Sequence, residues 1–462
     1  MSTSFTEIAY FVASLLFILG LRDLRSPETG RRGVRLAELA MLIAVSATLL
    51  HNHLVRYDWI IAGVLVGSVI GVAMALFIPM TKMPERIALS HSFGGLAAAL
   101  VGVAEYSRQS ATLGSGKMAA LGFEVMLGAV TFTGSLIAFG KLQGLVAERP
   151  LTHRFQNPLN FILIGATVAA IGYLVLQPAQ PALFYGMLGM SFLSGILLVL
   201  PIGGADMPVV ISLLNSYAGL AAAATGFALS NSVLIVCGAL DGASGFFLSI
   251  VMSKAMNRSF TNILFGAFGR ENGNGREPAR SAQKSLLGAT IGDALVVLGN
   301  ARSVIVVPGF GMAAAHAQHA VRELADLLEQ RGCVVKYAVH PVAGRMPGHM
   351  NVLLAEANIP YDHLYDIDAI NFEFAGTDVA LVVGANDVVN PAAKHDPQSP
   401  IYGMPVLNAE EARTVIVLKR SMNPGFAKIE NELFLRPNTM MLFGDARTTL
   451  VELAGRLREA GT

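Results

Sequence analysis

One run of residues, Ser303-Val304-Ile305-Val306-Val307-Pro308-Gly309-Phe310-Gly311-Met312-Ala313-Ala314, indicates how the C-terminal part of the chain folds. The β-branched run at its start has the length and composition of a buried parallel strand, and it leads into a Gly-x-Gly-x-x-Ala turn. Residues 313–331, which follow, have helical spacing and end before Gly332. A strand, a glycine turn and a helix in this order are typical of a dinucleotide-binding fold.

Three small residues give this turn its chemical meaning. Gly309 permits the tight turn, Gly311 lets the backbone approach a pyrophosphate, and Ala314 leaves room for the helix to pack on the strand. The phosphates would then lie at the helix N-terminus, where free backbone N–H groups attract anions. An ordinary tight turn is the alternative for so short a motif taken alone.

The ends of two other predicted strands favour NADP over NAD. The strand at 334–339 ends at His340, so the carboxylate that usually binds the ribose 2′-hydroxyl of NAD is missing there. The strand at 414–418 ends in Lys419-Arg420-Ser421, whose two cations and hydroxyl suit a dianionic 2′-phosphate. A solvated strand end is the alternative interpretation of these cations.

The C-terminal part as a whole has the pattern of a soluble α/β domain. Strands are predicted near 303–307, 334–339, 361–366, 379–383, 414–418 and 439–443, with helices between them and a last helix from Ala446 to about Glu459. Gly, Asn, Arg, Glu and Ser dominate the segment that precedes these strands. We therefore expect a flexible linker at 261–285 and a Rossmann-like, doubly wound parallel-sheet domain at 286–462.

The N-terminal part is far more apolar than an ordinary soluble protein. The whole chain is 53% hydrophobic and 14% charged, with a mean hydropathy of +0.55, and the apolar excess lies before residue 255. Stretches of membrane-spanning length lie at about 5–21, 36–55, 59–78, 87–106, 119–140, 158–176, 183–200, 207–228 and 232–252. We therefore expect residues 1–260 to form a multi-pass α-helical bundle of about nine transmembrane helices.

Basic residues between these spans set the orientation, because cytosolic loops carry an excess of Lys and Arg. With the N-terminus outside, twelve basic residues lie at the inner side and three at the outer side. The inner residues are Arg22, Arg25, Arg31, Arg32, Arg35, Lys82, Arg86, Lys141, Arg149, Arg154, Lys254 and Arg258, and the outer ones are Arg56, Arg108 and Lys117. The C-terminal domain is then cytosolic. The first segment lacks a basic start and a cleavage site, so we expect a retained helix.

Charge and cysteine content exclude several function classes. A net charge of +1 gives no polybasic signature for nucleic acid. Cys237 in an apolar segment and Cys333 after a predicted helix suggest neither a disulfide framework nor a metal site. We expect both to be small packing residues.

Polar side chains inside the predicted spans are candidates for function, because hydrocarbon makes them costly. His91 can change its charge near neutral pH and so carry a proton, and Asn215 can relay hydrogen bonds. Glu124, near the outer end of its span, is a candidate proton entry group, and Asp206 follows glycines that predict a bend at the cytosolic face. Helix packing or an interfacial position is the alternative for each of them. Asp241 lies inside the last span and has no obvious role.

Several longer stretches of the sequence resemble one known family. They are residues 202–210 (IGGADMPVV), 254–260 (KAMNRSF), 340–357 (HPVAGRMPGHMNVLLAEA), 384–393 (GANDVVNPAA) and 419–422 (KRSM). On these stretches the chain resembles the β subunit of proton-translocating NAD(P) transhydrogenase, nearly from end to end. Runs of this kind are far more specific than the Gly-x-Gly-x-x-Ala turn.

The resemblance implies an enzyme of the bacterial inner membrane, with a proton-conducting membrane domain and a cytosolic NADP(H)-binding domain. In this family a separate α subunit carries NAD(H), hydride passes directly between the two nicotinamides, and αβ units form a dimer. The implied activity is reversible, Re/Si-specific hydride transfer, coupled to inward proton movement that makes NADPH. Without the resemblance, an NADP(H)-gated channel or transporter explains the sequence equally well.

The resemblance also implies roles for individual residues. It assigns proton conduction to His91 and Asn215, to which we add Glu124, and a cytosolic hinge to Asp206, Lys254 and Arg258. It places Asp387 and Arg345 at the reacting nicotinamide. The implied NADP(H) contacts are Gly309, Phe310, Gly311, Ala314, Val342, Ala343, Gly344, Arg345, Met346, Pro347, Gly384, Ala385, Asn386, Asp387, Val388, Gly403, Met404, Val417, Leu418, Lys419, Arg420, Ser421, Met422, Asn423, Pro424, Asp445 and Ala446.

Three positions depart from the family pattern. Phe310 and Phe426 stand where tyrosines are expected, which removes the hydroxyls and keeps the ring contacts. Asp241 stands where an uncharged residue is expected, so it adds a pairing partner inside the bundle or lies beyond the true end of the span.

Overall fold

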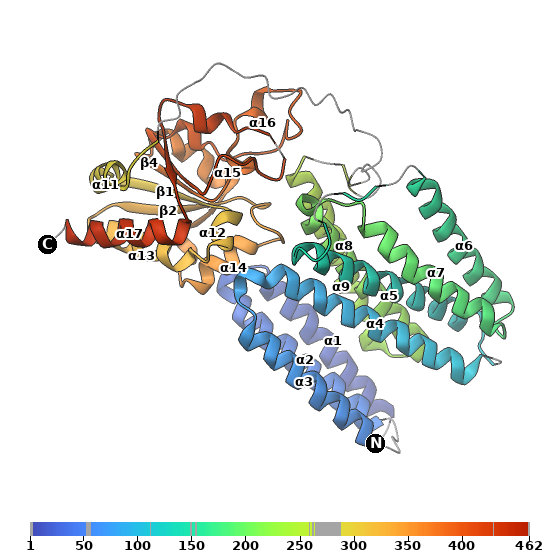
Figure 1. The fold of residues 1–462 in the computed structure, drawn as a ribbon. Helices are drawn as coiled ribbons and strands as arrows, with labels where there is room; N and C mark the ends of the chain where they lie inside the picture. The colour runs from blue at the N-terminus through green and yellow to red at the C-terminus, as the bar shows by residue number, and fades with distance from the viewer. Residues whose placement is uncertain are drawn as a thin grey trace. The chain divides into compact units, whose positions relative to one another are not determined.

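The structure is a computed structural model that describes residues 3–51, 57–110, 112–147, 150–152, 155–257, 259–260, 263, 288–427 and 429–460. The chain falls into two compact units. The first unit comprises Met1–Pro79, Glu85–Pro201 and Val210–Ser249, and the second comprises Met80–Pro84, Ile202–Val209 and Ile250–Thr462. Figure 1 labels the long helices of the first unit and several of the helices and strands of the second.

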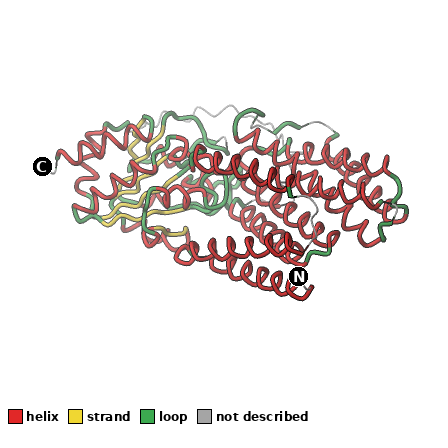
Figure 2. The backbone as a smooth tube through the Cα atoms, turned by 90° about the horizontal axis from the view of Figure 1, so that it is seen from below, coloured by secondary structure: helices red, strands yellow, loops and turns green. Residues whose placement is uncertain are grey.

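Long apolar helices make up the first unit (Figure 2). They are α1 (Thr3–Leu24), α2 (Pro27–His51), α3 (Asp58–Phe77), α4 (Met83–Gln109), α5 (Ser115–Leu142), α6 (Gln156–Leu176), α7 (Pro181–Val199), α8 (Met207–Leu229) and α9 (Ser232–Ala255). Within the described residues, all nine are long and apolar enough to cross a membrane, which confirms the predicted bundle. The largest difference between a predicted and an observed helix start is at α2, which begins nine residues before the predicted span at 36–55. Its first turns carry arginines, so hydropathy alone did not include them in the span.

The nine helices differ in how deeply this chain buries them. In the most apolar stretches of α5 and α8, 67% and 72% of the residues are buried inside this chain, so these two helices form the centre of the bundle. In α3 no described residue is buried. Trp59, the only tryptophan of the chain, lies in the first turn of α3 and is 74% exposed. Tryptophan at a helix end is typical of a membrane interface.

Glycines set how closely the central helices cross. A Cβ atom on Gly95 of α4 would lie 2.8 Å from Gly128 O of α5, and one on Gly128 would lie 2.7 Å from Gly95 O. A Cβ atom on Gly219 of α8 would likewise lie 2.8 Å from the Cα of Gly242 in α9. Backbones approach this closely in membrane bundles only where the interface residues are small.

The second unit is built on a six-stranded parallel sheet of order β3-β2-β1-β4-β5-β6. The strands are β1 (Ser303–Pro308), β2 (Val334–Val339), β3 (Leu364–Asp366), β4 (Val379–Val383), β5 (Thr414–Lys419) and β6 (Thr439–Phe443). This order is that of the Rossmann fold, so the predicted doubly wound sheet is confirmed. The strand order reverses between β1 and β4, which pair directly.

Both faces of the sheet are buried, because alternate residues of each strand face opposite sides. Val304 and Val306 of β1 pack with α11 (Ile291–Asn300), α13 (Gln318–Gln330) and α17 (Ala446–Glu459). Ile305 and Val307 pack on the other side. There the cover consists of short elements such as α15 (Ile367–Ile370), η4 (Asn371–Gly376) and η7 (Glu432–Leu435).

The structure corrects three expectations about the secondary structure of this unit. The helix predicted at 313–331 is broken into α12 (Phe310–Ala314) and α13, because His316 between them has a positive φ of 50°. The strand predicted at 361–366 is β3 only from Leu364, after the 3₁₀ turn η3 (Tyr361–His363). Between β4 and β5, and between β5 and β6, only short helical turns occur among the described residues.

Candidate functional site

The predicted cofactor contacts gather at one edge of the sheet, here called the carboxyl edge because the carboxyl ends of the strands lie there. The segments that follow β1, β2, β4, β5 and β6 are 309–314, 342–347, 384–388, 420–424 and 445–446. All strands are parallel, so these five segments begin at the same edge. Gly403 and Met404 precede β5, but Leu407 N donates to Val388 O at 2.9 Å and brings their loop to the same edge.

Two glycine turns cross each other at the centre of this edge. Gly309 N donates to Val383 O and Gly311 N donates to Gly384 O, both at 2.9 Å. A Cβ atom on Gly311 would lie 2.6 Å from the Cα of Gly384, so neither chain leaves room for a side chain. Such a bare backbone surface beside the strand switch point fits a dinucleotide pyrophosphate.

Ala314 does not have the packing role that the motif predicts. It is exposed at the end of α12, whereas Met312 and Ala313 are fully buried against the sheet. Helix α12 is only five residues long, and Met312 and Ala313 are the two of its residues that face the sheet. Close packing of helix on strand therefore depends on Ala313, one residue earlier than expected.

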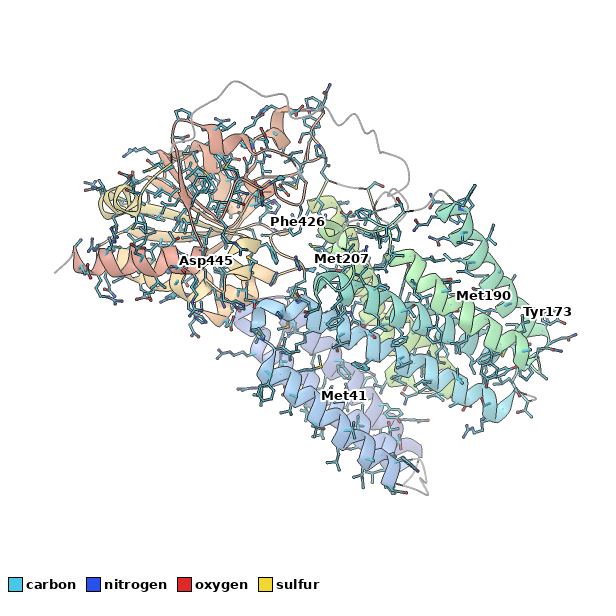
Figure 3. All side chains as sticks on the ribbon, viewed as in Figure 1. Met41, Tyr173, Met190, Met207, Phe426 and Asp445 are labelled. Atoms are coloured by element: carbon cyan, nitrogen blue, oxygen red, sulfur yellow. The ribbon has the colours of Figure 1, made fainter. Side chains whose placement is uncertain are left out.

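An arginine and two phenylalanines meet at the same edge. The guanidinium carbon of Arg345 lies 4.3 Å from the ring centre of Phe310, and the rings of Phe310 and Phe426 are 5.8 Å apart. Figure 3 labels Phe426, which lies in the loop after β5. A cation over an aromatic face is favourable and needs no hydroxyl. The contacts of Phe310 with Arg345 and with Phe426 are therefore present although both phenylalanines lack the expected tyrosine hydroxyl.

Asp387 is held under the loop that follows β5. Its Oδ2 accepts a hydrogen bond from Ala427 N at 2.9 Å, and its Oδ1 is buried with no hydrogen-bond partner in the described part of the chain. Burial raises the pKa of the Asp387 carboxyl above its usual range, an effect that the hydrogen bond and the charge of Lys419 oppose. The loop passes so closely that a Cβ atom on Gly425 would lie 2.5 Å from Oδ1.

At the cationic end of β5, one side chain is hydrogen-bonded to the backbone and the next is exposed. Lys419 is half-buried, and its Nζ donates to Asn423 O at 2.5 Å. Burial lowers the pKa of Lys419, and the carboxylate of Asp387 opposes that shift. Arg420 and Ser421 are exposed. The run therefore presents a guanidinium and a hydroxyl to solvent, with an ammonium behind them.

His340, at the end of β2, is turned into the protein. It is 1% exposed, its Nε2 lies 2.7 Å from Pro405 O, and its Nδ1 accepts from Val342 N at 3.2 Å. Since Nδ1 accepts, Nε2 carries the hydrogen that is donated to Pro405. The ring thus ties the loop after β2 to the loop that holds Gly403 and Met404.

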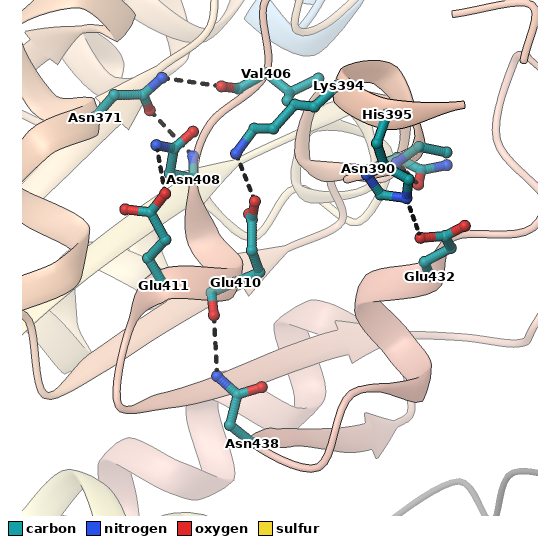
Figure 4. Close-up of polar contacts among 11 residues, drawn as sticks. Asn371, Asn390, Lys394, His395, Val406, Asn408, Glu410, Glu411, Glu432 and Asn438 are labelled. Atoms are coloured by element: carbon teal, nitrogen blue, oxygen red, sulfur yellow. Dashed lines mark hydrogen bonds and ion pairs between the residues drawn. The ribbon is translucent and has the colours of Figure 1, made fainter. Parts of the chain in front are cut away.

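Other side chains anchor the far side of that second loop (Figure 4). Asn371 Nδ2 donates to Val406 O at 2.9 Å, and its Oδ1 accepts from Asn408 N at 3.1 Å. Lys394 and Glu410 form an ion pair at 2.5 Å. Pro405 O is thereby held in place as the acceptor for His340.

The buried His340 makes the second unit sensitive to acid. Burial lowers the pKa of His340 to about 4, whereas an unfolded histidine titrates near 6.5. The unfolded state alone binds the proton between these values, so stability that is present above pH 6.5 is lost as pH falls to about 4, by about 3 kcal/mol. We expect His340→Gln to remove the part of this loss that comes from His340, whereas His349, which is also buried and whose pKa burial also lowers to about 4, keeps its own part.

Hydrogen exchange at 334–347 of the full chain, compared between pH 7 and pH 5 and corrected for intrinsic exchange rates, measures this effect. His319→Gln is the matched control, because His319 is exposed on α13. An acid sensitivity that is unchanged in His340→Gln would assign the effect to other groups.

Asp445, after β6, acts as a helix cap. Its Oδ1 accepts from Arg447 N at 3.1 Å and Thr448 N at 3.3 Å at the start of α17, and Figure 3 labels it. A capping carboxylate of this kind stabilises a helix by about 1 kcal/mol. One carboxylate oxygen of Asp445 is therefore engaged by its own helix, and the side chain remains exposed.

In the first unit, three polar side chains from three helices meet. Asn215 of α8 donates through Nδ2 to Asp241 Oδ1 of α9 at 3.1 Å. The imidazole of His91, on α4, lies beside the Asn215 amide and interacts with the charge of Asp241. The structure thus brings together the predicted pair His91 and Asn215, and adds Asp241 to it.

Glu124 of α5 lies at a different level of the bundle. It is 1% exposed, neither carboxyl oxygen has a hydrogen-bond partner in the described part of the chain, and Thr225 of α8 lies near the carboxyl group. Thr225 is ten residues from Asn215, or about 15 Å along the helix. Glu124 therefore lies about 15 Å from the His91 cluster.

The two predicted hinge residues that the structure describes, Asp206 and Lys254, fall in the second unit. Asp206 is 9% exposed and ends the 3₁₀ turn η2 (Gly204–Asp206) before α8, which confirms a bend there. Lys254 is exposed in the last turn of α9. Nearby, Asn257 Nδ2 donates to Tyr402 O at 2.5 Å, next to Gly403. Arg258 and the linker predicted at 261–285 lie outside the described residues.

Comparison with known proteins gives one consistent result. Residues 6–456 match the family model described as NAD(P) transhydrogenase beta subunit. Two curated relatives named NAD(P) transhydrogenase subunit beta, both from Rhodospirillum rubrum and one of a specified strain, are 48% identical over 454 residues, covering 97% of this chain and 98% of the relative. The chain belongs to the NAD(P) transhydrogenase β-subunit family.

Membership of this family has coarse consequences for the chain. An NAD(P) transhydrogenase is an oxidoreductase that uses nicotinamide nucleotides, and a β subunit has an α subunit as its partner. The nine apolar helices make this transhydrogenase subunit a membrane protein. Among its described residues, no group of three or more His, Cys, Asp or Glu side chains is placed to hold a metal ion.

Sequence reasoning missed several contacts of this transhydrogenase subunit. Asn431 Nδ2 donates to Asn386 O at 2.9 Å and so fixes the turn before Asp387. Pro405 and Ala427 supply backbone partners for His340 and Asp387. These partners lie 40 or more residues from the groups they bind, and no local pattern marks them. Asp241 was visible as a charge inside a span, but its contact with Asn215 was not.

Proposed function

We propose that this chain transfers hydride reversibly between NADP(H), bound by residues 286–462, and NAD(H) held by an α subunit, and that the transfer is coupled to protons moving inward to make NADPH. Residues 1–260 would conduct the protons and 261–285 would link the two parts. One observation carries the proposal: a single chain combines a glycine-crossed Rossmann edge with a His91–Asn215–Asp241 cluster inside apolar helices. Family membership supports it.

The carboxyl edge offers a fitting place for each part of NADP(H). The backbone at Gly309, Gly311 and Gly384 carries no side chain that would bar the pyrophosphate from this edge, although the N–H groups of these glycines already donate to Val383 O, Gly384 O and Leu418 O. Arg420 with Ser421 would take the 2′-phosphate. The strand β2 leads into His340 and not into an Asp or Glu, so no carboxylate at this position repels that phosphate. When bound, NADP(H) gives or accepts the hydride, which is the chemistry of the cofactor itself.

The protein would supply placement and exclusion of water. Arg345 over the Phe310 ring, with Phe426 tilted by 51° beside it, forms an aromatic and cationic surface near Asp387 against which a nicotinamide ring can rest. Val342–Pro347 and the segment 420–427 would close over the cofactor from the ends of β2 and β5. The nicotinamide must stay open to the NAD(H) of the partner, because hydride passes directly between the two rings.

Coupling requires that the protonation state of the membrane cluster changes which conformation of the NADP(H) unit is favoured. We assign the hinge of this change to Asp206, Lys254 and Arg258. A coupling free energy is reciprocal, so the redox state of the bound nucleotide must alter proton affinity near His91. Glu124 of α5 lies near Thr225, which is about 15 Å along α8 from Asn215, and it would exchange protons with the outer side.

The proposal includes an arrangement in the cell. The chain would span the bacterial inner membrane with its N-terminus outside and residues 286–462 in the cytosol, as the twelve inner basic residues against three outer ones favour. Two units of α and β subunits would form a dimer in the lipid bilayer.

Inverted membrane vesicles from cells that express this chain with its α partner provide the test. Reduction of an NAD analogue by NADPH is followed beside a pH dye in the lumen. We expect hydride transfer to acidify the lumen and an uncoupler to speed the transfer. NADPH binding and altered ion permeability without hydride transfer would instead show an NADP(H)-gated channel or transporter.

His91→Asn tests the proton path directly. Asparagine keeps a polar side chain of similar size but cannot bind a proton near neutral pH, so coupled turnover should fall by about 100-fold while NADPH binding persists. Ser90→Ala is the matched control, since Ser90 is the preceding, exposed residue of α4. Undiminished coupling in His91→Asn would remove His91 from the mechanism.

A further inference from the structure

Asp241 is a carboxylate that the proposed function does not yet use. It is the tenth residue of the 24-residue helix α9 and therefore lies well inside an apolar span. The helices of this chain leave it exposed. A carboxylate at such depth is costly in lipid, so it is expected to meet protein or water and to have a partner.

The backbones around Asp241 are held at close range. Ser216 Oγ donates to Gly242 O at 2.7 Å, across the tight crossing of α8 and α9. A Cβ atom on Gly245 would lie 2.9 Å from the Asn215 Nδ2 atom. Since Asp241 precedes Gly242 and Asn215 precedes Ser216, the same crossing fixes the two side chains relative to each other.

The hydrogen bond between them orients the Asn215 amide. Asn215 Nδ2 is the donor and Asp241 Oδ1 the acceptor, at 3.1 Å. A carboxylate can only accept, so it selects the nitrogen side of the amide and leaves the Asn215 oxygen free for another donor. The imidazole of His91 lies beside this amide, and its buried Nδ1 has no hydrogen-bond partner in the described part of the chain, so the ring has an N–H that it can turn toward this oxygen.

We propose that Asp241 is a positioning residue of the proton path: it turns the Asn215 amide so that its oxygen accepts from His91, and it supplies the countercharge when that imidazole is protonated. A protonated imidazole and a carboxylate together are neutral, which an apolar span tolerates better than a lone cation. This inference rests on the function proposed above and deepens its proton site.

Among the described side chains, few other charges lie near this cluster. His91 and Asp241 are the charged groups that face each other from α4 and α9, and α8 contributes the neutral Asn215 amide. The helices α1 and α2 pack on α9 around Cys237. Their charged residues are ion-paired near the cytosolic end (Arg22, Asp23 and Arg32) or exposed (Glu7, Arg31, Arg35 and Glu38), and Tyr10 is bonded to Thr48.

Two substitutions separate the charge of Asp241 from its hydrogen bond. Asp241→Asn keeps an acceptor oxygen and removes the charge, so in the vesicle assay it should slow coupled turnover about tenfold at neutral pH and recover at lower pH. Asp241→Ala removes both and should slow turnover at every pH, while Asp241→Glu should restore part of the rate. Ser244→Ala is the control, because Ser244 is exposed on the next turn of α9 and bonds only its own helix.

A spectroscopic readout tests the contact without turnover. Infrared difference spectra of the purified full chain, titrated with and without NADPH, should show a carboxylate band that is absent in Asp241→Asn and an imidazole titration that shifts in the same variant. Asp241 variants with the wild-type pH profile and an unshifted imidazole titration would overturn the inference.

The two levels of proposal fail in different ways. If the wild-type chain with its α partner transfers no hydride, the proposed function is wrong, and the infrared titration still decides whether Asp241 acts on His91. If the wild type is coupled and Asp241→Asn behaves like Ser244→Ala in both assays, only the role of Asp241 is wrong.

Discussion

Gly384→Ala is expected to abolish NADPH binding and to destabilise the sheet edge by about 3 kcal/mol or more. Gly384 has a φ of +66°, which is unfavourable for alanine. The new Cβ atom would also lie 2.5 Å from Gly311 C and Met312 N, which are backbone atoms of the opposite turn. The two turns cannot separate without breaking the hydrogen bond from Gly311 N to Gly384 O.

Gly332→Ala is the matched control for this change. Gly332 also has a positive φ, +82°, but a Cβ atom there meets nothing within 4 Å. The control therefore has the backbone cost of about 1 kcal/mol without the clash, and it should bind NADPH normally. NADPH fluorescence titration and hydrogen exchange at 303–315 measure both effects. Normal binding by Gly384→Ala would show that the pyrophosphate does not lie on this crossing.

Removing both cations at the end of β5 should change nucleotide selectivity. In Lys419→Ala/Arg420→Ala we expect NADPH to bind about 1000-fold more weakly, since each charge-assisted hydrogen bond to a phosphate contributes about 2 kcal/mol. NADH lacks the 2′-phosphate and should bind as weakly as it does to the wild type. The single Arg420→Ala variant is the cleaner one, because Lys419 also bonds Asn423.

Arg413→Ala is the control for these cations. Arg413 precedes the opposite end of the same strand and forms an ion pair with Asp378 at 3.0 Å. The Arg413→Ala substitution removes one positive charge near β5 but leaves the carboxyl edge unchanged. An equal loss of NADPH and NADH affinity in the double variant would show that Lys419 and Arg420 hold a different part of the nucleotide.

Local sequence patterns were enough to predict the architecture. Hydropathy located the spans because a helix needs about 20 apolar residues to cross a bilayer. The β-branched runs located the strands, and a parallel sheet then requires that the segments following them share an edge. The break at His316 was not predictable in this way, because a histidine with a positive φ leaves no compositional mark.

The arrangement of the site could be predicted only in part. Motifs named the loops at the carboxyl edge, but the partners of His340, Asp387 and Asn386 depend on how distant loops fold against one another. Asp241 differs from these. The glycines at 238, 242 and 245 mark the face of α9 that meets α8, and a helical projection would have placed Asp241 beside that face.

The position of Trp59 determines what optical spectroscopy can detect in this protein. Tryptophan emission of the whole chain comes from one exposed ring at the start of α3, in the first unit. Intrinsic emission therefore reports the polarity at one end of a single membrane helix, and the nucleotide-binding unit contributes none. A tryptophan placed in that unit on a Trp59→Phe background would be a single reporter of its conformation, free of any other indole signal.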